Sequence, residues 1–330
     1  MKEEKETVKE ESVSEKPQKK KSFFWVILLL FFLLITSCFI SLRSWLQPPG
    51  GRTNFLVLGV TGHDNFGGDL TDTMIYVSLD NQTGKVTLVS LPRDIWIPDL
   101  KIKINAAYHY GGFEMVKKTV SGITGQSVDY ALLIDSNLFV KIIDFLGGVD
   151  INVKTGFEDK NYPIVGREND LCNGDKELKC RYEDLIFQAG WQRMDGERAL
   201  KYVRSRYSSG DEGTDFARSK RQENLILALK NKILSWDFLS HPQKSRQLIN
   251  MILENIKTDV PQNKYWDLAK TGFRFRSDKL TTGVISDSFL INPKISKTYD
   301  NLWVLIPKDN NWSEVQKYIR CLEDGSPCQN

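Results

Sequence analysis

The stretch TDTMIYVSLDNQTGKVTLVSLPRD, residues 71–94, decides the fold of this chain. It holds two apolar runs, MIYVSL at 74–79 and VTLVSL at 86–91, and each has the length of a buried strand. The polar segment 80–84 between them has the composition of a turn, so the stretch predicts a β-hairpin. The two strands of a hairpin are antiparallel.

Strands and helices alternate outward from this hairpin. FLVLGV at 55–60 and YALLI at 130–134 are further short apolar runs of the kind that form buried strands. Longer stretches place apolar residues at helical spacing, and these are residues 106–120, 137–146, 195–201 and 215–234. The alternation predicts a layered α/β domain. Because it contains an antiparallel hairpin, we expect its central sheet to be mixed.

The N-terminal region has the pattern of a membrane anchor. Residues 1–21 are highly charged and poor in apolar residues, which predicts a disordered leader. Residues 23–42, FFWVILLLFFLLITSCFISL, carry no charge and would span about 30 Å as a helix, so we predict a transmembrane helix over residues 22–42. Lys19, Lys20 and Lys21 precede it, which predicts a cytoplasmic N-terminus and an extracytoplasmic remainder. A cleaved signal peptide is the alternative.

The cysteines agree with an exported domain. Cys38 lies in the predicted anchor, and the other four form two close pairs, Cys172 with Cys180 and Cys321 with Cys328. Close pairs outside the cytosol favour local disulfides. Four cysteines also suit zinc, but the spacings lack the tight CxxC pattern.

The part beyond the anchor divides by composition. Residues 43–53 contain a Pro-Pro-Gly-Gly cluster and predict a linker. The main domain is predicted to span residues 54–258, and its polar segment 156–190, without a clear period, has the character of an insertion. Residues 259–330 are the C-terminal part of the same domain or a small extension. This last region predicts a strand, LWVLIP, at 302–307.

A final helix is expected after Asn311. Asn311 and Glu314 are three residues apart and fit a capping box, in which each side chain bonds to the backbone N–H of the other's residue.

Arginines cluster where the predicted elements begin or end. Arg93 follows a strand, and ligands of α/β sheets usually bind at strand ends. Arg204 and Arg206 are two residues apart, so in an extended segment both point to one side.

A further cluster lies on the helix expected from residue 215. Arg218, Arg221 and Gln222 are three and four residues apart and share one helical face. Convergent guanidinium groups repel one another unless an anion lies between them, and Arg is well shaped for phosphate. Asp72 could then hold Mg²⁺, which commonly joins carboxylates to phosphates. Taken singly, each cluster also fits a solvated helix face or a cap.

The order of these motifs resembles the LytR–CpsA–Psr family from residue 54 to about residue 234. The matching segments are FLVLGV, LTDT at 70–73, SLPRD at 90–94, KINAAY at 103–108 with the following YGG, DFLGGVDINV at 144–153, GERALKYVRSR at 196–206 and the Asp-x-x-Arg-x-x-Arg-Gln run at 215–222. Each motif is weak by itself, but the ordered set behind a single predicted anchor is specific.

This resemblance implies a fold and an activity. The implied fold is a three-layer α/β/α sandwich with a mixed central sheet. The implied activity is that of an extracytoplasmic phosphotransferase of the cell membrane, with Mg²⁺ as cofactor. Its partners are a polyprenyl pyrophosphate-linked glycan, whose lipid chain lies in an apolar groove, and a peptidoglycan hydroxyl as acceptor.

The resemblance also assigns roles by position. The implied pyrophosphate contacts are Arg93, Lys103, Arg204, Arg206, Arg218 and Gln222. Asp94 and Asp215 orient these groups and complete the catalytic set with Arg93, Arg204 and Arg206, and one of the two aspartates is the candidate base. Asp72 is the implied metal ligand.

Two positions depart from the family pattern near the implied metal. Thr61 stands where family members often have Asp, and Leu70 where they often have Arg. The loop between them contains His63, Asp64 and Asp69, so Asp64, Asp69 and Thr61 become further candidate ligands.

Other functions remain open. A pyrophosphatase would use water as acceptor on the same lipid, and a non-catalytic envelope module would only bind it. A transcription regulator is disfavoured because only the short leader would face DNA. The net charge of +3 gives no basic excess, so no nucleic-acid partner is expected.

Overall fold

The computed structural model describes residues 31–37, 39, 41, 50–61, 69–167, 169–208, 210–273, 279–325 and 328, with the backbone alone for residues 215, 216 and 273. The chain divides into two compact units, Met1–Gln47 and Pro48–Asn330. In the first unit, residues 31–37 are helical. Over the described residues, none of the helices has the length and apolar character needed to cross a bilayer. The leader 1–21 and much of the predicted anchor 22–42 lie outside the described residues.

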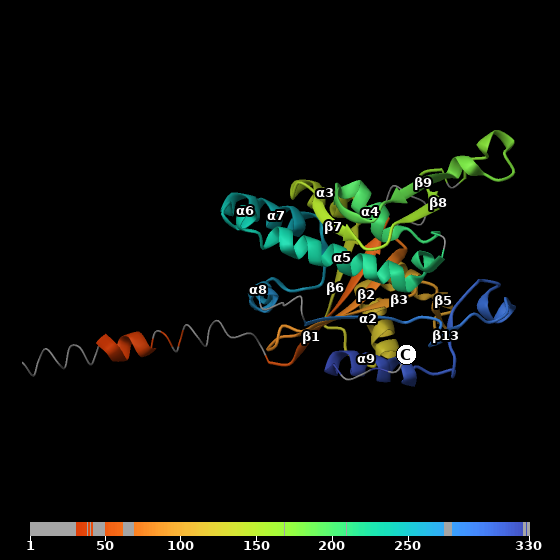
Figure 1. Cartoon of the computed structure of the whole chain (residues 1–330). Helices are drawn as coiled ribbons and strands as arrows, with labels where there is room; N and C mark the ends of the chain where they lie inside the picture. The colour runs from red at the N-terminus through yellow and green to blue at the C-terminus, as the bar shows by residue number, and fades with distance from the viewer. Residues whose placement is uncertain are drawn as a thin grey trace, which may run out of the picture. The chain divides into compact units, whose positions relative to one another are not determined.

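A six-stranded sheet forms the centre of the second unit (Figure 1). Its order is β11-β6-β1-β2-β3-β12, with β1 at Arg52–Val60, β2 at Thr71–Asp80, β3 at Val86–Leu91, β6 at Tyr130–Asp135, β11 at Lys257–Thr258 and β12 at Leu280–Val284. The predicted hairpin is β2 and β3, which are antiparallel, whereas β1 with β6 and β3 with β12 are parallel. The prediction of an α/β fold with a mixed central sheet is confirmed.

Helices lie on both faces of this sheet (Figure 1). On one face, α2 (Ala107–Thr124) and α9 (Ser313–Asp324) bury Val116, Val120 and Ile319 against Leu56, Leu58 and Tyr76 of the strands. On the other face lie α3 (Ser136–Phe145), α4 (Gly196–Arg204) and α5 (Asp215–Ile233). The strand residues alternate between the two faces, as the period of two requires.

The C-terminal helix is tied to the sheet by a buried polar contact. The Tyr76 hydroxyl donates to the carboxylate of Glu323 at 2.9 Å, and both side chains are buried. Burial raises the pKa of Tyr76, and the nearby Glu323 raises it further. Arg52 and Lys85 donate to the last carbonyl groups of α9, where a helix end carries partial negative charge.

In the C-terminal region the final helix after Asn311 is confirmed as α9, the predicted strand is confirmed only in part, and the predicted capping box is wrong. In residues 302–307 only Ile306–Pro307 forms a strand, β14, which pairs with β13 (Leu290–Ile291). The run before it follows a turn with positive φ at Asp300 and Asn301, and these angles break extended backbone. The capping box does not form, because Trp312 is the N-cap of α9 and Asn311 instead accepts the N–H of Ser313 in a local turn.

The predicted insertion 156–190 is an ordered arm. Its strands β8 (Phe157–Pro163) and β9 (Tyr182–Phe187) pair antiparallel, and the disulfide Cys172–Cys180 closes the loop that joins them (Figure 1). The base of the arm packs through Phe157 and Phe187 against Tyr202 of α4. A second disulfide, Cys321–Cys328, links α9 to the residues that follow it.

Candidate active site

The site lies at one edge of the sheet, where β1 and β3 end and β2 begins. The register of the hairpin pairs Met74 with Leu91, so Asp72 and Arg93, just beyond these residues, come side by side. Thr61, the residue after β1, reaches the same edge because Val60 pairs with Thr71. This is the strand-end position at which α/β sheets usually bind ligands.

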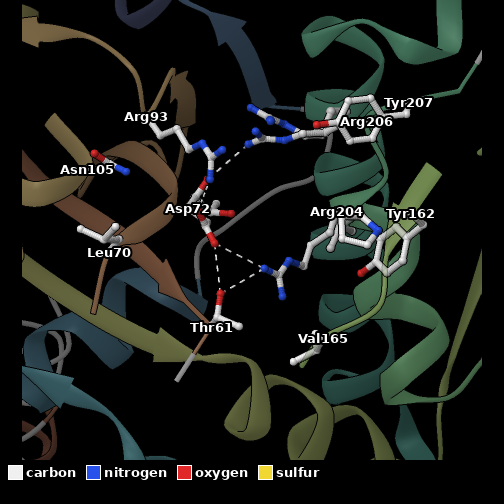
Figure 2. Close-up of a pocket in the computed structure, with 14 residues that line it drawn as sticks. Thr61, Leu70, Asp72, Arg93, Asn105, Tyr162, Val165, Arg204, Arg206 and Tyr207 are labelled. Carbon is white, nitrogen blue, oxygen red and sulfur yellow. Dashed lines mark hydrogen bonds and ion pairs between the residues drawn. The ribbon is translucent and has the colours of Figure 1, made fainter. Parts of the chain in front are cut away.

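Asp72 is the point at which these side chains meet (Figure 2). Its Oδ1 accepts a short hydrogen bond from Nη1 of Arg93, and its Oδ2 accepts one from the Thr61 hydroxyl at 3.1 Å. Nη2 of Arg204 lies 3.5 Å from the same Oδ2, and Nη2 of Arg206 donates to the backbone carbonyl of Asp72 at 3.4 Å. Three arginines from two segments of the chain therefore converge on one aspartate.

The Asp94 carboxylate contacts both Arg93 and Lys103. It lies 3.6 Å from Nε of Arg93 and accepts from the Lys103 ammonium at 2.7 Å. Burial lowers the pKa of Arg93, but the charges of Asp72 and then Asp94 outweigh burial, and the net shift is upward. Arg93 is therefore fully charged at physiological pH. Two cations already share the Asp94 carboxylate, so it positions Arg93 and is a poor candidate for the base.

The segment with Arg204 and Arg206 is not the extended strand that the spacing suggested. Arg204 is the last residue of α4, and Ser205 is its C-cap. The following turn is held by Asp159 of β8, which is fully buried and accepts from the Ser205 hydroxyl at 2.6 Å and from the N–H groups of Arg206 and Tyr207 at 3.1 Å each. Sequence reasoning missed Asp159, which lies in the segment read as an insertion.

The three residues predicted to share a face of α5 have different surroundings. Arg218 is buried and lines the same polar pocket as Arg93 and Arg204. Arg221 is 3% exposed and structural: it donates to Glu212 at 2.9 Å and to the Ser205 carbonyl at 2.8 Å, and burial lowers its pKa. Gln222 lines the apolar groove and accepts from the Ser90 hydroxyl at 3.4 Å.

Two neighbouring cavities share Asp72 in their lining. A polar pocket of about 370 Å³ is lined by Thr61, Leu70, Asp72, Arg93, Asn105, Tyr162, Val165, Arg204, Arg206, Tyr207 and Arg218, among others (Figure 2). An apolar groove of about 250 Å³ lies between the sheet and α4 and α5, and its lining includes Val57, Ile75, Ile134, Phe139, Leu200, Leu225, Ile226 and Leu229. The two cavities share Asp72, Thr73, Val203 and Arg204.

The polar pocket is cationic. Asp72 is the only carboxylate residue among the described side chains of its lining, against Arg93, Arg204, Arg206 and Arg218. Tyr162 and Val165 come from the arm and Tyr207 from the turn that Asp159 holds, and sequence reasoning named none of them. Such a pocket suits a phosphate-bearing group, because guanidinium groups bind phosphate oxygens in pairs.

The candidate metal ligands are partly brought together. Thr61 and Asp72 touch, whereas the carboxylate of Asp69 lies 4.0 Å from Nδ1 of His109 at the protein surface. Asp64, His63 and the side chain of Asp215, whose backbone begins α5, lie outside the described residues. Among the described residues, the only group of three potential metal-binding side chains is Asp170 with the disulfide-bonded Cys172 and Cys180. The described part of the site therefore offers a metal one carboxylate and one hydroxyl.

Comparison with known proteins defines the class. The model of the LytR_cpsA_psr family matches residues 5–320. The chain is 27% identical over 217 residues to a polyisoprenyl-teichoic acid–peptidoglycan teichoic acid transferase, TagU of Bacillus subtilis, covering 64% of this chain and 61% of that protein. Its likeness to TagV of the same organism is 27% over 264 residues, covering 78% of this chain and 61% of TagV.

A solved structure agrees with these matches. The crystal structure of B. subtilis TagV superposes with a TM-score of 0.59 at 25% identity and covers 84% of this chain and 100% of that one. Because the family model spans nearly the whole chain, this protein belongs to the LytR_cpsA_psr family. The matched region spans 61% of the length of both TagU and TagV.

Proposed function

We propose that this protein is a phosphotransferase that moves a glycopolymer phosphate from a polyprenyl pyrophosphate lipid to a hydroxyl group of peptidoglycan. One observation carries the proposal: an arginine-lined pocket lies next to an apolar groove, and Asp72, Thr73, Val203 and Arg204 line both. A lipid pyrophosphate has this same division, with a charged head and an apolar chain. The names of TagU and TagV, which describe teichoic acid transfer from a polyisoprenyl carrier to peptidoglycan, support this choice.

In the proposed reaction the acceptor oxygen attacks the sugar-proximal phosphorus. The bond from that phosphorus to the bridging oxygen breaks, and polyprenyl phosphate leaves with, in the net reaction, the proton of the hydroxyl. Phosphoryl transfer needs alignment and charge stabilisation more than covalent help from the protein. Arg93, Arg204 and Arg206 supply both, because fixed cations stabilise the charge that develops on the phosphoryl oxygens.

We include Mg²⁺ in this proposal. The residues fit a metal that binds together with its substrate: Asp72 and the Thr61 hydroxyl are adjacent, and pyrophosphate oxygens would supply further ligands. The ion would neutralise pyrophosphate charge. Since Asp72 is already paired with Arg93 and Arg204, the substrate-free site should attract the cation weakly.

Calorimetry tests the metal. Mg²⁺ should bind tightly only in the presence of a short-chain polyprenyl pyrophosphate analogue, and Asp72→Asn should remove that binding, because the amide carries no charge. Tight binding to the substrate-free protein that persists in Asp72→Asn would place the metal elsewhere. Asp69→Asn is the control, since this carboxylate lies at the surface beside His109.

The proposal also includes the location of the reaction. The charge-free run in residues 22–42 would anchor the chain, and Lys19, Lys20 and Lys21 would keep its N-terminus in the cytoplasm. The second unit would then meet its lipid and its acceptor outside the cell membrane. The cysteine pairs Cys172–Cys180 and Cys321–Cys328 support an oxidising location.

Product analysis tests the function. Purified full-length protein with lipid-linked glycan should release polyprenyl phosphate and form a glycan–peptidoglycan phosphodiester only when peptidoglycan is present. Equal release of free glycan phosphate without peptidoglycan would identify a pyrophosphatase, and binding without turnover a lipid-binding module. Protease added to intact protoplasts should abolish the activity, and protection of the activity would refute the extracytoplasmic location.

A further inference from the structure

Exposed apolar side chains occur along the segment that runs from the end of α5 through α6 and α7. Leu234 follows α5, Trp236 and Leu239 belong to α6 (Trp236–Leu239), and Ile249 and Leu253 to α7 (Pro242–Asn255). All five side chains are exposed, Trp236 by 84% and Ile249 by 55%. We call these five residues the helical patch. Grouped exposed apolar side chains of this size usually mark an interaction surface.

The exposure does not come from loose packing. Phe238 of α6 and Leu248 of α7 are buried together with Leu146, and Ile252 packs against them. Ile249 and Leu253 are four residues apart on one face of α7, so the helix has one face in the protein and another directed outward. The two helices are therefore fixed while they present apolar side chains.

The apolar groove reaches the buried cluster that supports the helical patch. Leu229 lines the groove and also packs against the cluster of Leu146, Phe238 and Leu248. From Arg218 in the polar pocket, α5 runs to Ile233 beside that cluster, about 22 Å at 1.5 Å per residue. A lipid with its pyrophosphate at the arginines would thus extend its chain toward the helical patch.

The chain enters the second unit at the same end of the molecule. Arg52, the first residue of β1, pairs with Asp80, at the opposite end of the sheet from Asp72. In Figure 1, α6, α8 (Tyr265–Phe273) and the start of β1 lie toward the left of the folded unit, whereas β5 (Ile102–Lys103), β8 and β9 lie toward the right. The second unit therefore begins, at the start of β1, on the same side of the sheet as α6.

The charges around the helical patch suit a phospholipid surface. Lys230 and Lys232 lie in the last turn of α5, and Lys244 and Arg246 lie on α7. Over residues 230–255 these four cations exceed the two anions, Asp237 and Glu254. Tryptophan favours the membrane–water interface, and neighbouring cations favour anionic head groups.

We propose that the helical patch rests in the head-group region of an anionic phospholipid bilayer and holds the groove open toward the lipid phase. The proposal rests on the proposed function, because it supplies the route by which a membrane lipid enters the groove. Trp236 and Leu239 sit among the lipid head groups, and the arginine-lined pocket stands about 20 Å above them, where a water-soluble acceptor can reach it.

A depth measurement tests the proposal on the full-length chain in bilayers of phosphatidylcholine and phosphatidylglycerol. In a Cys38→Ser background, Trp236→Cys is labelled with an environment-sensitive dye, and the matched control is Ile186→Cys on β9 of the arm, also exposed. Nitroxide lipids should quench the dye at position 236 and not the dye at position 186. Omission of phosphatidylglycerol should reduce the quenching at 236.

The same measurement can contradict the proposed contact with the bilayer. If aqueous iodide quenches both dyes alike and nitroxide lipids quench neither, the helical patch does not touch the bilayer and a protein partner becomes the better occupant. This readout does not depend on turnover, so it separates failure of the docking from failure of the proposed function. The double variant Trp236→Ser with Leu239→Ser should lower transfer from bilayer-embedded lipid about tenfold and leave transfer from a short-chain soluble analogue unchanged.

Discussion

Arg204→Ala weakens binding of a soluble polyprenyl pyrophosphate analogue by about tenfold or more, and the double variant Arg93→Ala with Arg204→Ala abolishes measurable binding. A charge-assisted hydrogen bond is worth about 1.5–3 kcal/mol, and about 1.4 kcal/mol is tenfold in affinity. Both guanidinium groups converge on Asp72 in the polar pocket, so each loss leaves the pyrophosphate with fewer donors. Isothermal titration calorimetry measures the effect directly.

Arg198→Ala is the matched control for this result. Arg198 lies on α4 as Arg204 does, but its guanidinium group lies over the Phe187 ring at 4.6 Å and does not line the polar pocket. The control removes the same charge from the same helix and should bind the analogue as the wild type does. Equal affinity for wild type, Arg93→Ala and Arg204→Ala would mean that the arginines do not bind the head group.

Asp159→Ala lowers the free energy of unfolding by about 3 kcal/mol or more and also weakens binding of the same analogue. The buried carboxylate accepts three hydrogen bonds from Ser205, Arg206 and Tyr207, and its removal leaves these donors without a partner. The turn that directs Arg206 into the polar pocket then loses its anchor. Urea denaturation gives the stability, and calorimetry at a temperature where the variant is folded gives the affinity.

Asp150→Ala tests whether the effect is specific to position 159. Asp150 is an exposed carboxylate on β7 (Val149–Val153), 4.0 Å from Arg193, and exposed pairs of this kind contribute about 0–1 kcal/mol. Its removal should change neither stability nor affinity appreciably. If Asp159→Ala were equally harmless, some other contact would have to hold residues 205–207.

Four strands of the central sheet, β1, β2, β3 and β6, could be predicted because they are short apolar runs in which no residue is exposed, whereas the short edge strands β11 and β12 were not predicted. Every residue of β3 is buried. A short, continuous apolar run of this kind usually forms a strand in the core of a sheet. The arm could not be predicted in the same way. Its register shifts between Asp159 and Tyr162, which breaks the alternation of two by which strands are recognised.

The arginines of the site could be predicted from the sequence, but the residue that positions Arg206, Asp159, could not. Arg93, Arg204 and Arg206 lie in motifs that resemble a family, whereas Asp159 reaches them from a segment with no motif. Arg221 was predicted to share a ligand-binding face with Arg218 because of its helical spacing. In the structure it is instead buried and bonded to Glu212 and the Ser205 carbonyl. Spacing indicates which face of a helix a residue occupies, and only the packing decides which partner lies there.

The place of β12 in the sheet has a consequence for how the chain folds. β3 ends at Leu91, but its parallel neighbour β12 begins at Leu280, and the buried bond from Tyr76 to Glu323 joins residues 247 positions apart. Contacts of such long range close large loops and form late. Synthesis of the chain proceeds from the N-terminus to the C-terminus. Until the C-terminal segment has been synthesised and β12 has paired, β3 is therefore an unpaired edge strand that is prone to aggregation. The last part of the polypeptide thus sets the time at which the domain can finish folding, and early truncation should yield an aggregating chain.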